Sequence, residues 1–446
     1  DMTFRTNGFT SALVIASDQS VSTPTAGNNN VRIGLNAGAG ILSGGNANVM
    51  LGDNAGTAVT LGDNNVLIGY NTADTLTEGT DNTAVGQGAL STEVKGNRST
   101  AVGAAALNQQ TNSSSTNANN TAVGYYAGFT VSQGTANTLI GTEAGKVLGN
   151  VNYNTAVGAF ALDACSHGSQ TTAIGYGALT TQDYGTTTTT SFNTAVGYLA
   201  AAALSTGQSC TVMGNSAGQH ISSGSANTFL GSAAGTGVSG TPITGSNNTA
   251  VGANSGNNLR GAAHSNSFLG YRSGLSVTTG SENTYIGFEA GDATQTAISN
   301  TAVGYRALSA AANTGNTAIG RNSLIVVTGS SNTGLGKDSG LEIVGGSNNM
   351  CLGHDSGRSS SPGGSITSGN NTITLGDNNI ATANIKVDWT VSSDQRDKTD
   401  FTALDIGLDF VKALNPVTYK WDQRSDYGDQ DADDWSLSDQ TPDGTH

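Results

Sequence analysis

The stretch Asn-Thr-Ala-Val-Gly-Tyr-Arg-Ala-Leu at residues 300–308 is one copy of a phrase that recurs through most of the 446-residue chain. Close copies begin at Asn82, Asn120, Asn154, Asn193, Asn283 and Asn316. The Gly of each copy, here termed the marker glycine, stands at positions 86, 103, 124, 141, 158, 175, 197, 214, 231, 252, 270, 287, 304, 320, 336 and 353. Nine of the fifteen intervals between these glycines are 17 residues, and the others are 16, 18, 21 or 22. A short period sustained over such a length predicts a solenoid of stacked coils.

The residue before each marker glycine is always Val, Ile, Leu or Met, and the residue before that is mostly Ala. Successive residues of a strand point to opposite faces, so we expect the Val/Ile/Leu row to point into the coil. Both faces of the strand are then largely apolar, which is typical of a strand that is covered on both sides. We expect the coil interior to be one cover and a second copy of the chain to be the other.

Two further positions of the phrase are nearly constant. Ala or Ser stands three residues after most marker glycines, which predicts a corner that admits only a small side chain. Asn stands four residues before thirteen of the sixteen marker glycines, and the exceptions are Ser99, Thr171 and Cys210. Coils stacked about 4.8 Å apart would bring these amides into a buried ladder that satisfies the backbone of the turn.

The composition fits a thin, repetitive core. The chain has 63 Gly, 36% hydrophobic residues and only 11% charged residues, and its net charge is −15. The negative charge argues against nucleic acid as a partner, and no apolar run approaches a membrane span, so membrane insertion is not expected. Cys165, Cys210 and Cys351 stand at different places in the repeat, so we expect buried thiols and neither a disulfide nor a metal site. No cofactor is expected.

The order of patterns predicts four regions. Residues 1–29, with strand-like stretches at 2–5 and 12–16, are the end of an upstream β module. Residues 30–376 form an all-β parallel β-solenoid (β-roll) whose early coils close at Gly34, Gly52, Gly62 and Gly69. About twenty coils would make a rod of roughly 90–100 Å. Residues 377–392 are an exit strand or linker, and 393–446 begin a small α+β domain with a helix at 403–414 and a strand at 417–421.

The longer intervals place insertions at residues 108–119, 180–192, 237–247 and 359–370. Insertions in a solenoid form loops on one surface, so these are candidates for ligand contact, with inert loops as the alternative. Tyrosine recurs directly after the marker glycine. Stacking on sugars and packing at an edge of the chain are both open for this row, and we favour packing. Its members are Tyr70, Tyr125, Tyr176, Tyr198, Tyr271 and Tyr305.

The repeat ends at Gly376, and a different sequence pattern follows. Ser393-Asp394-Gln395-Arg396-Asp397-Lys398 is followed by Gly-Leu-Asp-Phe-Val-Lys-Ala-Leu-Asn-Pro-Val-Thr-Tyr-Lys-Trp at 407–421. This combined pattern resembles the intramolecular-chaperone, self-cleaving domain at the C-terminus of phage tailspikes and tail fibres, including endosialidases. The resemblance covers about residues 392–446. The shaft is similar only in style to the heads of trimeric autotransporter adhesins, which are β-rolls.

The chaperone resemblance implies a homotrimer, because domains of this family hold three chains together while the fibre folds. They then cut themselves off. Carried onto this chain, the resemblance makes Ser393 the nucleophile, Lys398 the general base and Ser392–Ser393 the scissile bond. A Ser hydroxyl needs a nearby base, and a desolvated Lys can supply one.

Downstream, Asp429, Asp431 and Asp433 form an acidic run. An EF-hand loop would require Gly where Asp434 stands and Glu where Gln440 stands, so that specific match fails. A looser calcium site and a solvated acidic loop both stay open, and we favour the loop.

Three functions remain in view. The first is the shaft of a homotrimeric phage tail fibre or tailspike in the virion, with a host-surface glycan or protein receptor and other tail proteins as partners. The second is a trimeric bacterial surface adhesin. The third is a glycan-degrading tailspike enzyme, which needs paired carboxylates, and Glu143, Glu289, Asp163 and Asp183 show no recurrent pairing. Apart from autoproteolysis by a Ser-Lys dyad, we predict no enzymatic activity.

Overall fold

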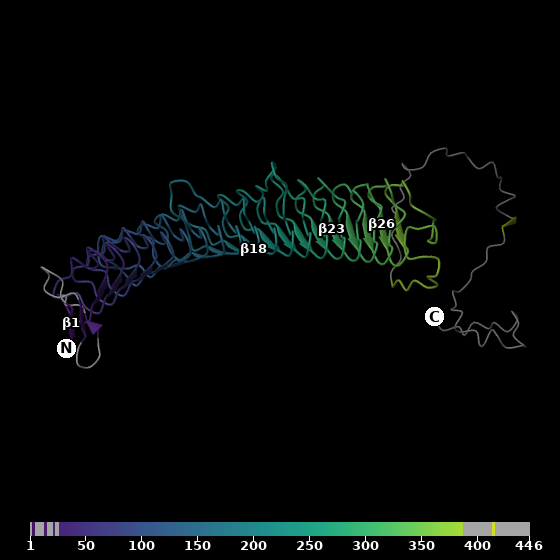
Figure 1. Ribbon diagram of the computed structural model, residues 1–446. Coiled ribbons are helices and arrows are strands. Elements are labelled where there is room, and N and C mark those ends of the chain that lie inside the picture. The colour runs from purple at the N-terminus through teal and green to yellow at the C-terminus, as the bar shows by residue number, and fades with distance from the viewer. Residues whose placement is uncertain (1, 5–12, 16–20, 23–25, 387–412, 415–446) are drawn as a thin grey trace, which may run out of the picture. The chain divides into compact units, whose positions relative to one another are not determined.

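The computed structural model describes residues 2–4, 13–15, 21–22, 26–386 and 413–414. The chain divides into two compact units, residues 1–382 and 383–446. The elements defined in the first unit are all strands, and most of them follow one another along a single stack of coils (Figure 1). Equivalent strands of adjacent coils pair in parallel, commonly 17 residues apart. The all-β parallel solenoid expected from the repeat is therefore confirmed.

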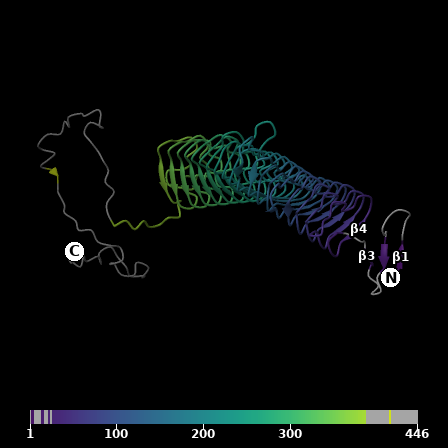
Figure 2. The same ribbon diagram turned by 90° about the vertical axis from the view of Figure 1, so that its left-hand side faces the viewer.

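One long parallel sheet runs along the stack, and Figure 2 shows its strands side by side. Each strand pairs with the next, so that Leu139 of one coil lies beside Ala156 of the following coil. Residues at the same place in the phrase therefore form rows along the sheet. The strands are β4 (Val31–Ile33), β5 (Val49–Leu51), β6 (Val66–Ile68), β7 (Thr83–Val85), β9 (Thr100–Val102), β11 (Thr121–Val123), β12 (Thr138–Ile140), β13 (Thr155–Val157), β15 (Thr172–Ile174), β17 (Thr194–Val196), β18 (Thr211–Met213), β19 (Thr228–Leu230), β20 (Thr249–Val251), β21 (Ser267–Leu269), β22 (Thr284–Ile286), β23 (Thr301–Val303), β24 (Thr317–Ile319), β25 (Thr333–Leu335), β26 (Met350–Leu352) and β27 (Ile373–Leu375).

Among the described residues, seven short strands lie outside this sheet. β1 (Met2–Phe4), β2 (Leu13–Ile15) and β3 (Val21–Ser22) form an antiparallel sheet of their own, which confirms the strand-like stretches near the start. Two insertions add parallel pairs, β8 (Gly96–Asn97) with β10 (Thr116–Asn117) and β14 (Gly168–Ser169) with β16 (Thr189–Thr190).

One sequence expectation about the start of the solenoid is wrong. Gly62 does not close a coil; it lies between β5 and β6, and its carbonyl accepts a hydrogen bond from the Asn48 amide. Of the expected exit strand or linker at 377–392, the structure describes residues 377–386, and these contain no strand. Residues 387–392 lie outside the described residues. Ile380 and Ile385 are exposed there, and no neighbouring strand is paired with them. The expected helix at 403–414 and strand at 417–421 lie outside the described residues, except for Ala413 and Leu414.

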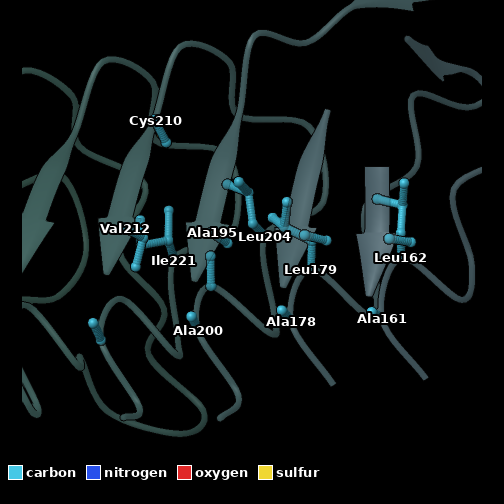
Figure 3. Close-up of a cluster of buried hydrophobic side chains, with 14 of the residues drawn as sticks. Ala161, Leu162, Ala178, Leu179, Ala195, Ala200, Leu204, Cys210, Val212 and Ile221 are labelled. Carbon is cyan, nitrogen blue, oxygen red and sulfur yellow. The ribbon is translucent and has the colours of Figure 1, made fainter. Parts of the chain in front are cut away.

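The middle residue of each strand from β5 to β26 lies inside the coil, so the inward row is the mostly Ala row. Figure 3 shows Ala195 and Val212 on their strands, beside Leu204 and Ile221 of the coil interior. The expectation that the Val/Ile/Leu row points inward is wrong. That row alternates with the Ala row and therefore faces away from the coil's own interior.

In most coils of the solenoid, bulk at one of two core positions goes with a small residue at the other. In one kind of coil the inward strand residue is Ala and a Leu stands four residues after the marker glycine, as with the buried Ala302 and Leu308. In the other kind the inward residue is large and the second position is Gly, as with Tyr285 and Gly291. A Cβ on Gly291 would lie 2.5 Å from the Tyr285 ring, so the ring occupies the room that Leu fills elsewhere.

The marker glycines are required by close backbone contact. At Gly287 the φ angle is +138°, and a Cβ there would lie 2.4 Å from the carbonyl oxygen of Gly304 in the next coil. An L side chain would meet both the strained φ and this contact. The corner three residues later is also closed, because the Ala or Ser side chains there are buried, and Ser273 donates to the Tyr285 carbonyl at 2.7 Å.

The expected asparagine ladder is confirmed. The Asn266 amide donates to Asn248 Oδ1 at 3.0 Å and to the Gly280 carbonyl at 2.8 Å. Its own Oδ1 accepts from the backbone and side-chain nitrogens of Asn283, each at 3.1 Å. All three Asn side chains are fully buried. The ladder therefore satisfies polar groups that the thin coil cannot expose to water.

Two of the three ladder exceptions are repaired by glutamines. Gln110 donates to Ser99 Oγ at 3.0 Å and accepts from the Asn120 amide at 2.9 Å. Gln182 makes the same bridge from Thr171 to Asn193, with both distances 3.0 Å. Both glutamines lie in the expected insertions. The first two insertions thus have a structural role inside the coil, whatever their surfaces contact.

Candidate interaction surfaces

The outward side of the long sheet carries two rows of side chains, which we name the outer sheet face. One row stands one residue before each marker glycine and its equivalents from Ile33 to Leu375, and it is Val, Ile, Leu or Met throughout. The other stands three residues before the glycine and is mostly Thr. Within the single chain the apolar row is half-buried to exposed, with Ile33 58%, Leu269 50% and Ile140 40% exposed. This is a continuous apolar strip without a charged residue.

The tyrosine row lies directly after the marker glycines, and its side chains are 46–53% exposed. Tyr271, Phe288 and Tyr305 stack in sequence with ring centroids 5.3 and 5.2 Å apart. Tyr176 stacks on Tyr198 at 5.4 Å. The neighbouring rings cover one another's faces and leave mainly edges exposed. Because sugars stack on free ring faces, this arrangement favours the packing role over sugar binding.

Two shallow depressions lie near the first insertion. One is lined by amide and hydroxyl side chains, including Asn112, Ser114, Gln133 and Asn152. The other is lined by aromatic and amide side chains, among them Gln87, Asn108, Tyr125, Tyr126 and Phe129. Mixed aromatic and amide surfaces can contact glycans, so these depressions are the described surfaces on which the expected ligand contact by insertion loops could occur.

Of the four carboxylates considered for a glycan-cleaving enzyme, Glu143 and Asp163 interact electrostatically with each other and with the same Lys146. Glu143 pairs with Lys146 at 2.8 Å, and Glu289 contacts Arg272 at 3.0 Å and Arg306 at 3.6 Å. Burial raises the pKa of Asp163, whose Oδ1 has no hydrogen-bond partner. Nothing in this arrangement places two carboxylates on opposite sides of one groove, as glycoside hydrolysis requires.

Ser166, His167 and Asp183 bring together the residue types of a hydrolytic triad. Ser166 Oγ lies 2.6 Å from His167 Nδ1 and 2.5 Å from Asp183 Oδ1. The same ring nitrogen lies 3.5 Å from Asp183, so the imidazole does not stand between the hydroxyl and the carboxylate as proton relay demands. Burial raises the pKa of Asp183, but hydrogen bonds from Ser166 and His167 outweigh it and lower that pKa overall. The cluster is a hydrogen-bonded contact between coils.

Asp338, His354 and Asp355 place three potential metal ligands within 4.8 Å of one another. The chain supplies its own cations to this cluster. Lys337 Nζ lies 2.8 Å from Asp338 Oδ2 and 3.1 Å from His354 Nε2, and Arg358 Nη1 lies 2.6 Å from Asp355 Oδ1. Two neighbouring cations disfavour a bound metal ion. The sequence did not suggest this cluster, because its residues come from separate coils and share no short motif.

The three cysteines are free and buried, as expected. Burial raises the pKa of the Cys165 and Cys351 thiols to about 11, which keeps them protonated and unreactive at neutral pH. Cys210 donates to the Gly224 carbonyl at 3.3 Å, in the place where most other coils use the ladder amide.

The remaining predicted site residues, Ser392, Ser393, Lys398, Asp429, Asp431 and Asp433, lie outside the described residues. Comparison with known families bears on this part of the chain. Residues 393–437 match the family model described as chaperone of endosialidase. No curated protein and no solved structure matches the chain. Among the described residues, no helix has the length and hydropathy to cross a membrane.

The family match and the solenoid together fit an endosialidase-type tail fibre with a C-terminal chaperone domain. They support a structural role of the tail-fibre or tailspike kind. The match also supports the expectation, drawn above from the resemblance, that a chaperone of this family forms trimers.

Proposed function

We propose that this chain is the shaft of a homotrimeric phage tail fibre or tailspike, part of the virion, that attaches the particle to the host surface. The observation that carries the proposal is the succession of a long repetitive solenoid and a segment matching the chaperone of endosialidase. A stack of thin coils is a stiff spacer, because each coil bonds to its neighbours along the whole sheet. The chaperone match favours this role over the bacterial adhesin.

The chaperone segment releases itself by autoproteolysis in this proposal. Ser393 Oγ attacks the carbonyl carbon of Ser392 while Lys398 accepts the hydroxyl proton. The Ser392–Ser393 C–N bond breaks, which leaves an ester on Ser393 Oγ and a free amine that takes up the proton. Water then hydrolyses the ester, so the shaft ends in a carboxylate at Ser392 and the released fragment begins with Ser393.

The experiment is intact-mass measurement of the full-length protein after expression. We expect a fragment that begins at Ser393 in the native chain, its loss in Ser393→Ala and Lys398→Ala, and its persistence in the matched control Ser438→Ala. An uncut native chain would contradict self-processing. Light scattering of the same samples gives the assembly state, and a monomeric native protein would contradict the trimeric fibre.

A further inference from the structure

The residue type in the apolar row of the outer sheet face is more constant than the stability of a single coil requires. From strand to strand of the long sheet the inward residue ranges from Gly334 through Ala302 to Tyr285, whereas the outward residue before the marker glycine is always Val, Ile, Leu or Met. Strand propensity does not explain this difference. Thr serves the same strands two residues earlier on the same face, yet no Thr occurs in the apolar row.

The changes in coil length also avoid this face. The insertions lengthen the connections between strands, and the register of the long sheet stays unbroken through them. The row directly after the marker glycines, by contrast, admits Asp53, Gln87, Arg321 and Lys337. The apolar row, on the exposed side of the same coils, contains no polar residue from Ile33 to Leu375. A single partner with a constant surface along the whole length would account for this.

The size of the strip suits a stable protein interface. Strands about 4.8 Å apart give the sheet a length of roughly 90–100 Å, and three residues give it a width of about 10 Å. The resulting area of about 900–1,000 Å² per chain is comparable with the roughly 800 Å² per partner of standard interfaces. Small molecules and glycans are held by polar groups that converge on one site. The polar groups of this face are the hydroxyls of the Thr row, which repeat from strand to strand along the sheet and do not converge.

We propose that copies of this chain associate through the outer sheet face, with their strands at matching heights. A second copy has the same spacing between rows and the same length, so it can cover the strip at every coil. Because the strip itself is uncharged, contact here places no like charges directly opposite each other, although each chain has a net charge of −15. The inference rests on the proposed function, because it assigns the contact surface of the proposed trimer.

Cysteine cross-linking of the full-length protein tests this assignment. Ile286→Cys places a thiol on the outer sheet face, and Thr296→Cys places a matched thiol on an exposed loop of the same coil. The native cysteines are buried and serve as the background in the unmodified chain. We expect a short bismaleimide to convert Ile286→Cys into covalent dimers, while Thr296→Cys and the native chain stay unlinked.

Light scattering separates the two proposals. If the native protein is a trimer and Thr296→Cys links while Ile286→Cys does not, the outer sheet face is not the interface and the trimeric fibre stands. A monomeric native protein overturns both. As a second variant, Ile286→Asp combined with Ile319→Asp is expected to lower the assembly state while hydrogen exchange within the coils stays unchanged. An unchanged trimer in that variant would also overturn the assignment.

Discussion

The inward and outward faces of the same strands solve different packing problems. On the inward face residue size varies from coil to coil, and in most coils a second position compensates, as Leu308 does for Ala302 and Gly291 does for Tyr285. On the outward face no second position is available and the residue type stays constant. This difference indicates that each coil adjusts the packing of its own interior, whereas the outward face contacts a partner whose surface is constant along the solenoid.

The largest expected change in stability comes from exchanging the residue sizes at the two inward positions of one coil. Tyr285→Ala removes a fully buried ring and is expected to destabilise its coil by about 3–5 kcal/mol. Adding Gly291→Leu recreates the Ala and Leu pair of the next coil, Ala302 and Leu308, and should restore most of that loss. Hydrogen exchange of peptides covering β22 measures both changes.

The neighbouring outward residue supplies the control. Ile286→Ala removes a side chain that is 38% exposed in the single chain, so its cost within the coil should be about 1 kcal/mol. If the double variant is no more protected than Tyr285→Ala alone, size exchange does not maintain the core.

Sequence reasoning predicted the solenoid, its period and the asparagine ladder, because each follows from a regular spacing. It assigned the wrong inward row, although the spacing within the motif is sufficient to identify the correct row. The ladder Asn and the Val/Ile/Leu position are three residues apart and must face opposite sides, so a buried Asn300 requires an outward Val303. The prediction followed the apolar character of the Val/Ile/Leu row and not this alternation of faces.

Other features had no local signal in the sequence. The glutamines that repair the ladder act on residues 11 positions away, Ser99 with Gln110 and Thr171 with Gln182, and only the fold brings them together. The left-handed residue two positions after the marker glycine, such as Arg306 with φ +52°, carries many residue types, so composition did not reveal it. The predicted cleavage residues came from the family resemblance and remain predictions.

Removing one ladder amide tests the polar part of the inward face, because the ladder asparagines are buried there. Asn266→Ala leaves the Gly280 carbonyl and the Asn283 backbone nitrogen without these buried partners. We expect a loss on the order of 1–3 kcal/mol in the adjacent coils. Asn215→Ala, at an exposed position outside the ladder, should change stability by less than about 0.5 kcal/mol. Denaturant dependence of hydrogen exchange gives both values, and equal costs would deny the ladder its structural role.

The smallest expected effect concerns pH, because the amides of the ladder do not titrate whereas a carboxylate at one corner of the last coils does. Burial raises the pKa of Asp338, but hydrogen bonds from Lys337 and Asn322 outweigh it and hold that pKa below its ordinary value of 3.8. A carboxylate with a lowered folded-state pKa stabilises the fold above pH 3.8, and this contribution is lost as the pH falls through the folded-state value. Since Lys337 is largely exposed, we expect a loss below about 1 kcal/mol, confined to the coils around β25 and β26. Hydrogen exchange corrected for intrinsic rates should show this loss in the native chain and not in Asp338→Asn. An equal acid response in coils held only by the ladder would mean that the corner carboxylate is not its source.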